Sequence, residues 1–172
     1  MSTFLYLAVV VLATIGCGNA QEASPNGTVY TAVFLNSESR QRLIQFWNTT
    51  VPITSNLGKV YAEHMTLQFN PTEREVAALP KGKIVDIYGF LWASDAVSCE
   101  GIQVYSPTIK SNNTNSHCTV STGIATGAVC TNELLTKVHN GSKGIRFGYM
   151  KNLLKLTGCV DTFPPSGKCK FL

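Results

Sequence analysis

The sequence predicts an α+β domain with a largely antiparallel sheet, and three observations support this fold class. Segments rich in β-branched and aromatic residues alternate irregularly with helical ones, in the order β-α-β-α-β-β-β-α-β. This order lacks the regular strand–helix alternation of a doubly wound parallel sheet. No low-complexity or linker-like stretch divides the 172 residues, which suit one domain with one core.

Each element follows from its local residue types. Thr28–Leu35 is β-branched and aromatic and predicts a strand, and Ser37 is the expected N-cap of a helix ending near Asn48. Lys59–Phe69 predicts a second strand, and a short helix is expected at Thr72–Leu79. The remaining expected elements are strands at Ile84–Trp92, Gly101–Tyr105, Cys118–Thr122 and Leu153–Phe163, and a helix at Thr131–Val138 with Thr131 as its cap.

The first twenty residues have the features of a secretory signal peptide. Residues 1–20 carry no charged side chain, and an apolar run extends over Phe4–Ile15. Small residues at Gly18 and Ala20 occupy the −3 and −1 positions of a signal-peptidase site. The run is shorter than the roughly 20 residues that span a membrane, although the missing Lys and Arg leave an uncleaved anchor as the alternative. We expect a secreted, extracellular domain over residues 21–172, without membrane association.

Composition limits the partners and cofactors. The expected mature domain carries the whole formal charge of +4, with 14 basic and 10 acidic residues. This balance permits a nucleotide ligand, but no Lys/Arg block indicates non-specific binding to a nucleic-acid backbone. No C-x-x-C pair supports a zinc site, so no metal or other cofactor is expected. Four N-x-S/T sequons predict a glycoprotein, and they start at Asn26, Asn48, Asn112 and Asn140.

The cysteine count predicts disulfides. Of the 6 cysteines, Cys17 lies in the expected leader, and the remaining odd number allows at most two disulfides within a monomer. Cys159 and Cys169 are near enough in sequence to tie down the C-terminal tail. The pairing itself stays open at this stage.

Two copies of a His-x-Thr-aliphatic tetrad carry the candidate chemistry. The tetrads HMTL and HCTV begin at His64 and His117, 117 − 64 = 53 positions apart, and use two of the 3 histidines. Side chains alternate between the faces of a strand, so His64 and Thr66 share one face, as do His117 and Thr119. Each tetrad therefore places an imidazole beside a hydroxyl on one face of its strand. The apolar side chains on the opposite face can pack into a core.

Two such strands across a groove contain the groups that phosphodiester hydrolysis requires. One neutral imidazole can take a proton from water, and one protonated imidazole can give a proton to the leaving alkoxide. Threonine hydroxyls can donate to the non-bridging oxygens, where charge grows in the transition state. We therefore predict His64 and His117 as the catalytic pair and Thr66 and Thr119 as phosphate-binding residues, with the acid and base roles unassigned.

Three aromatic residues are candidates for stacking on a nucleobase. They are Tyr30, Tyr61 and Trp92. The alternative for each is a place in the core, where aromatic side chains of strands usually lie.

The residues around the tetrads resemble a known superfamily. The matching stretches are TVYTAVFL, KVYAEHMTLQF, and SNNTNSHCTVST followed by TNELL. They are similar to the two-histidine phosphoesterases, and most to the cyclic phosphodiesterase domain of fungal-type tRNA ligases and its stand-alone relatives. The resemblance implies a bilobal α+β fold, with mostly antiparallel sheets around a central cleft and a pseudo-twofold axis. It also implies hydrolysis of 2′,3′-cyclic phosphates of nucleotides or RNA ends to 2′-phosphates, and we expect a monomer.

Two other hypotheses stay open. A catalytically silent secreted binding protein or effector could use the same fold, and an unrelated structural or defence protein could contain both tetrads by coincidence. The expected leader also departs from the mostly intracellular relatives and argues against a role in tRNA splicing. Cys118, within the second tetrad, is an unusual residue there, although it should face away from the cleft.

Overall fold

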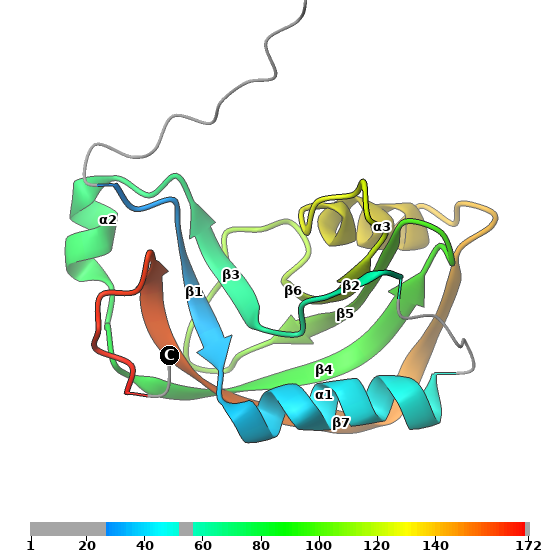
Figure 1. Cartoon of the computed structure of the whole chain (residues 1–172), viewed down its shortest axis with the longest axis horizontal. Coiled ribbons are helices and arrows are strands. Elements are labelled where there is room, and N and C mark those ends of the chain that lie inside the picture. Colours follow the sequence, from blue (N-terminus) through cyan, green and yellow to red (C-terminus); the bar gives the residue numbers. More distant parts are fainter. Residues whose placement is uncertain (1–26, 52–56, 171–172) are drawn as a thin grey trace, which may run out of the picture.

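Seven strands and three helices make up the part of the chain that the structure, a computed structural model, describes, namely residues 27–51 and 57–170 (Figure 1). In chain order they are β1 (Tyr30–Leu35), α1 (Ser37–Thr50), β2 (Lys59–Val60), β3 (His64–Phe69), α2 (Glu73–Ala78), β4 (Ile84–Ser94), β5 (Cys99–Tyr105), β6 (His117–Thr122), α3 (Cys130–His139) and β7 (Arg146–Phe163). The predicted leader and the sequon at Asn26 lie outside the described residues.

The strands form one antiparallel sheet that closes on itself. Their order across the sheet is β2-β6-β3-β1-β7-β4-β5, and β5 also pairs with β6. The six longer strands therefore make a closed barrel, and the short β2 is a third partner of β6, besides β3 and β5. The 18-residue β7 pairs with β1 near its C-terminal end and with β4 along most of its length. It therefore lies between these two strands in the barrel.

The expectation of a bilobal, pseudo-twofold α+β fold is wrong. Two lobes would each need a sheet of their own, whereas β6 pairs with both β3 and β5 and joins all strands into one closed sheet. Helices contribute only short segments of 14, 6 and 10 residues in the described part of the chain. The two tetrads therefore lie on neighbouring strands of a single barrel.

Most expected elements are present, with changed boundaries. Asn36, not Ser37, caps α1, because its side chain accepts a hydrogen bond of 2.8 Å from the Ser39 N–H. Thr131 lies inside α3, which has no side-chain cap. The single strand expected over residues 59–69 breaks into β2 and β3, where Ala62 takes a left-handed conformation with φ 51°.

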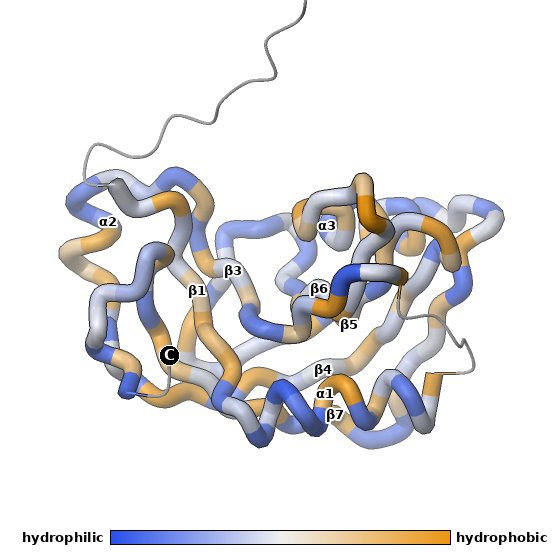
Figure 2. Tube along the Cα trace, in the orientation of Figure 1, coloured by the Kyte–Doolittle hydropathy of each residue, from blue (hydrophilic) through white to orange (hydrophobic). Residues whose placement is uncertain are grey.

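Two apolar clusters hold the helices against the barrel. α1 packs along β7, and its Leu43 and Trp47 are buried in the larger cluster. Figure 2 shows hydrophobic and hydrophilic residues alternating along this helix, as expected for a helix with one buried face. α3 packs on β5 and β6 through Leu134, Leu135 and Val138. None of the helices in the described ranges is long and apolar enough to cross a membrane.

Two disulfides fasten loops to the barrel. Cys159 and Cys169 are bonded, which confirms the expected attachment of the C-terminal tail to β7. Cys99 and Cys130 join β5 to the first residue of α3. Cys118 is a free and buried thiol, so its side chain does face the core as expected.

Candidate active site

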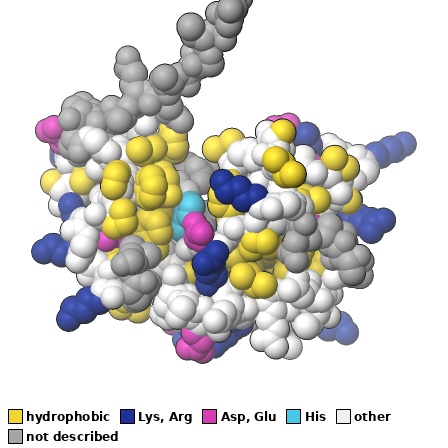
Figure 3. All heavy atoms as spheres, in the orientation of Figure 1, with side chains coloured by type: hydrophobic (Ala, Val, Ile, Leu, Met, Phe, Trp, Pro, Cys, Tyr) yellow, Lys and Arg dark blue, Asp and Glu magenta, His cyan; other side chains and the backbone are white. Residues whose placement is uncertain are grey.

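A cavity of about 460 Å³ contains all four residues predicted from the tetrads. It is lined by Tyr30, Tyr61, Glu63, His64, Thr66, Phe69, Asn113, His117, Thr119, Ala128, Val129, Asn132 and Phe163. Figure 3 shows a histidine side chain (cyan) in a hollow near the centre of this face, with acidic and basic side chains close by and a hydrophobic wall on one side. The size is suitable for a small organic ligand.

The antiparallel pairing of β3 with β6 brings the two tetrads together. Met65 pairs with Cys118, and both side chains are buried in the core. The residues before and after this pair point to the other face, which is the cavity. An antiparallel register places each histidine opposite the threonine of the other strand. Two imidazole–hydroxyl pairs therefore face one another in the cavity.

His117 has a defined orientation. Its Nδ1 lies 2.6 Å from the backbone oxygen of Asn115. A carbonyl oxygen only accepts, so Nδ1 carries the proton and Nε2 is the atom left to exchange a proton. Burial lowers the pKa of His117, and the hydrogen bond to Asn115 partly opposes this effect.

His64 lies in a more apolar setting. The ring of Tyr30 stacks on it with centroids 5.1 Å apart, and Phe34 lies at 5.6 Å. Burial, and secondly the nearby His117, lower its pKa to about 4. Neither ring nitrogen of His64 has a hydrogen-bond partner among the described residues. His64 is therefore neutral near pH 7 and free to accept a proton.

The three predicted stacking residues have different positions. Tyr30 lies between His64 and Phe163, with ring centroids 5.1 and 5.0 Å away, and burial together with Glu63 raises the pKa of Tyr30 to about 12. Tyr61 lines the cavity, and the Lys59 ammonium lies 4.8 Å from its ring centroid.

Trp92 does not line the cavity. Its ring meets Trp47 edge-on at 6.4 Å, and it packs against the larger apolar cluster. Gly148 leaves room for its indole, since a Cβ there would lie 2.8 Å from the indole nitrogen. Trp92 is therefore a partly buried residue that packs against the core, as is usual for an aromatic residue of a strand.

The two threonine hydroxyls differ in their partners. Thr119 donates to the Ala128 carbonyl at 2.8 Å and also contacts the Thr131 hydroxyl at 2.9 Å. The Thr66 hydroxyl has no partner within the described ranges and lines the cavity. Thr66 is therefore the hydroxyl that is free to donate to a ligand.

Comparison with known proteins gives a likeness of fold. No protein-family model matches the sequence, and no curated protein matches it. The crystal structure of a fungal RNA kinase matches with a TM-score of 0.60 over 77% of this chain, at 14% sequence identity. The fold resembles that of the fungal RNA kinase. This chain covers 44% of the kinase chain, so the likeness concerns one part of a longer protein.

Three polar residues that line the cavity were not predicted as site residues from the sequence. Strand alternation over residues 59–69 would turn Glu63 away from His64, but Glu63 lines the cavity and its carboxylate lies 3.4 Å from the Arg40 guanidinium. Alternation does not hold here because the strand is broken at Ala62. Asn113 and Asn132 also line the cavity. They lie close to the second tetrad in sequence, and this proximity is the one signal that could have identified them.

A metal centre is not evident in the part of the chain that the structure describes. No group of three or more His, Cys, Asp or Glu side chains within it could hold a metal ion. The polar side-chain groups that line the cavity are two imidazoles, two threonine hydroxyls, two tyrosine hydroxyls, two amides and one carboxylate. Such a set can transfer protons and donate hydrogen bonds to an anion.

Proposed function

We propose that this protein is a metal-independent phosphodiesterase that hydrolyses 2′,3′-cyclic phosphates of nucleotides or RNA ends to 2′-phosphates. The observation that carries the proposal is the meeting of both imidazole–hydroxyl pairs, His64 with Thr66 and His117 with Thr119, in one cavity. The resemblance of the tetrads to two-histidine phosphoesterases supports the same chemistry, and we propose membership of that superfamily. The RNA kinase with the similar fold adds support for an RNA-related substrate.

The two histidines have separate roles in the proposed reaction. Neutral His64 takes a proton from water as the water oxygen attacks phosphorus. His117 gives its Nε2 proton to the 3′ oxygen as the bond between that oxygen and phosphorus breaks. The Asn115 carbonyl, which accepts the Nδ1 proton, supports the charged form of His117. Proton exchange with solvent then restores both rings.

The cavity walls match the two parts of a nucleotide. Phe69, Phe163 and Tyr61 are aromatic lining residues that can contact a base, and we place the phosphate beside His64 and Thr66. Both faces of Tyr30 are already engaged by His64 and Phe163. We therefore assign base stacking to Tyr61, and we assign to Tyr30 the support of His64.

The proposal includes an extracellular location and a monomeric, glycosylated chain. The two disulfides are compatible with an oxidising compartment. The sequons at Asn48, Asn112 and Asn140 lie at exposed positions. The leader over residues 1–20 and the domain limits 21–172 remain part of this proposal.

One observation favours a second candidate, a catalytically silent binding protein. The pKa values of both histidines are lowered in the free protein. At pH 7 the empty cavity would then lack a protonated acid, and turnover requires that the anionic phosphate raise the pKa of His117. A binder would retain the cavity and hold a cyclic phosphate without cleaving it.

A hydrolysis assay distinguishes the two candidates. The four nucleoside 2′,3′-cyclic phosphates are incubated with the protein in EDTA, between pH 5 and pH 7, and the products are separated as 2′- or 3′-phosphates. We expect 2′-phosphates, since the proposed acid protonates the 3′ oxygen. Binding of the cyclic phosphates without any product would support the silent binder, and a requirement for a divalent cation would contradict the mechanism.

A further inference from the structure

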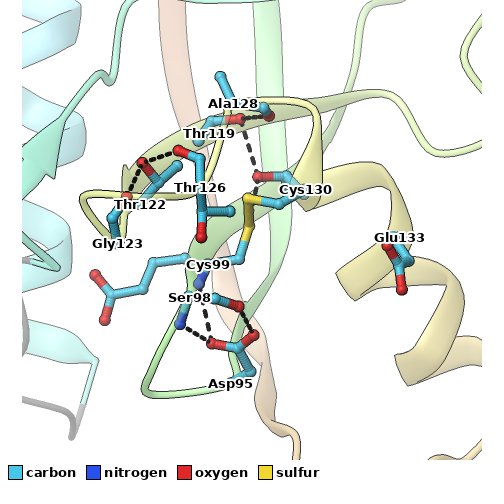
Figure 4. Close-up of a disulfide and its surroundings, with 12 residues drawn as sticks. Asp95, Ser98, Cys99, Thr119, Thr122, Gly123, Thr126, Ala128, Cys130 and Glu133 are labelled. Atoms are coloured by element: carbon cyan, nitrogen blue, oxygen red, sulfur yellow. Dashed lines mark hydrogen bonds between the residues drawn. A yellow bond between two sulfur atoms is a disulfide. The ribbon is translucent and has the colours of Figure 1, made fainter. Parts of the chain in front are cut away.

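The hydroxyl proton of Thr119 already takes part in a hydrogen bond within the protein. A hydroxyl has one proton, and Thr119 gives it to the Ala128 carbonyl, which can only accept. The contact with Thr131 is then a hydrogen bond that Thr119 accepts. Figure 4 shows the hydrogen bond from Thr119 to Ala128, beside the Cys99–Cys130 disulfide. Thr119 therefore has no proton left for a phosphate oxygen, and β6 lacks the donor that Thr66 supplies from β3.

A different donor lies on the same side of the cavity. The Oδ1 of Asn132, in the first turn of α3, accepts a hydrogen bond of 3.1 Å from the Asn115 N–H. Because that N–H requires an acceptor, the orientation of the carboxamide is fixed by chemistry. The Nδ2 group of Asn132 has no partner among the described residues, and Asn132 lines the cavity together with His117 and Thr119.

A single buried residue holds this amide and His117 in place. Asn115, whose side chain is 5% exposed, accepts from His117 Nδ1 through its carbonyl and donates to Asn132 through its N–H. Its own Nδ2 also donates to the Asn132 carbonyl at 3.3 Å and to the Thr136 hydroxyl at 2.9 Å. The imidazole and the free amide donor are therefore fixed relative to each other before a ligand arrives.

We propose that Asn132 is a phosphate-binding residue of this site, which donates from Nδ2 to a non-bridging oxygen in the place expected for Thr119. This inference rests on the proposed function, because it assigns one contact of the same phosphate. An amide that is already oriented needs no reorganisation when negative charge develops on the oxygen. Thr66 and Asn132 then supply one donor from each side of the cavity.

Asn132→Asp is the sharpest test of this contact. The aspartate keeps an oxygen for the Asn115 N–H and replaces only the NH₂ group by an acceptor. Loss of one such donor lowers kcat by about 10²–10³-fold in comparable sites, and we expect a loss of that size. Asn113→Asp is the matched control, since it makes the same change from amide to carboxylate in the same cavity, at a side-chain amide that no hydrogen bond with the described residues orients. We expect it to lower kcat by less than about tenfold, because the added charge is the same but no oriented donor is lost.

The possible outcomes separate this inference from the proposed function. If the unmodified protein hydrolyses cyclic phosphates and Asn132→Asp is no slower than Asn113→Asp, the inference is overturned while the function stands. If the unmodified protein shows no turnover, the proposed function fails, and binding of inorganic phosphate by calorimetry then decides the inference. Weaker phosphate binding by Asn132→Asp than by Asn113→Asp would support it, and equal binding would overturn it. Thermal unfolding of both variants shows whether each is folded.

Discussion

His64 and His117 lie in one cavity but have different neighbours. The rings of Tyr30 and Phe34 lie against His64, and burial lowers the pKa of His64 to about 4. His117 has its Nδ1 proton on the Asn115 carbonyl, which opposes the lowering of its pKa by burial. Two titratable groups with different surroundings are the usual basis for separate base and acid roles. Within the proposed reaction we therefore assign His64 as the base and His117 as the acid.

The pH dependence of kcat/KM follows from these pKa values, because that ratio reports the free enzyme. His64 must be neutral to act as base, so kcat/KM should rise with pH through about 4. His117 must be protonated to act as acid, so kcat/KM should fall as the pH passes the pKa of His117, which burial lowers below the ordinary imidazole value of 6.5. We expect a maximum between these limits in a pH–rate profile with a cyclic nucleotide. A ratio that still increases above about pH 7 would contradict the assigned roles.

The elements that carry the site are β3, β6 and the first turn of α3. β6 is buried along its whole length and presents His117 to the cavity from the barrel wall. α3 is fastened beside it by the Cys99–Cys130 disulfide and by the buried Thr131, which contacts Cys99 Sγ at 3.4 Å. Gly101 on β5 allows this close packing. The position of α3 therefore decides where its cavity residues lie.

Gly101→Ala should displace α3. A Cβ at this position would lie 2.3 Å from Thr131 Cγ2 and 3.0 Å from the Cys118 carbonyl oxygen. Overpacking of this kind lowers the free energy of unfolding by about 1–3 kcal/mol, and we expect a simultaneous loss of activity. Gly127→Ala is the control, because its nearest contact is Val129 Cγ2 at 4.0 Å. Urea unfolding and kcat/KM of both variants provide the measurement, and equal effects of the two substitutions would argue against this role of Gly101.

The sequence was sufficient to bring the four tetrad residues into one cavity, and insufficient to predict the barrel that holds them. His64, Thr66, His117 and Thr119 could be predicted as neighbours because a two-residue period and a repeated tetrad are local patterns. The closure of the barrel could not, because the pairing of β5 with β6 joins residues that no local pattern links. The free Nδ2 of Asn132 was also inaccessible, since it depends on a hydrogen bond from Asn115, 17 positions away.

At the largest scale, residues 27–51 and 57–170 form a closed barrel that carries two disulfides. The Cys99–Cys130 bond closes a loop with a sequence separation of 31, and the Cys159–Cys169 bond one of 10. The first disulfide attaches α3, whose Asn132 lines the cavity, to β5. The second attaches the tail that follows β7 to that strand. The two bonds should therefore differ in their effects on stability and on activity.

Removal of each disulfide by paired Cys→Ser substitutions tests this difference. The loop-entropy relation gives about 4 kcal/mol for the bond with the longer loop and about 3 kcal/mol for the other. We expect the variant without Cys99–Cys130 to lose more stability in urea unfolding, and also more activity, because α3 is released. A larger loss in the variant without Cys159–Cys169, for both quantities, would contradict this account.

The central claim is that His64 and His117 together hydrolyse a cyclic phosphate. The most direct measurement is kcat/KM for a nucleoside 2′,3′-cyclic phosphate, in EDTA, for three single His→Ala variants. We predict a loss of about 10²–10⁴-fold for His64→Ala and for His117→Ala. His139→Ala, at an exposed position where Nε2 lies 3.0 Å from Gln103 Oε1, should stay within about twofold of the unmodified protein. Retention of more than about a tenth of the activity by both cavity variants would contradict the account.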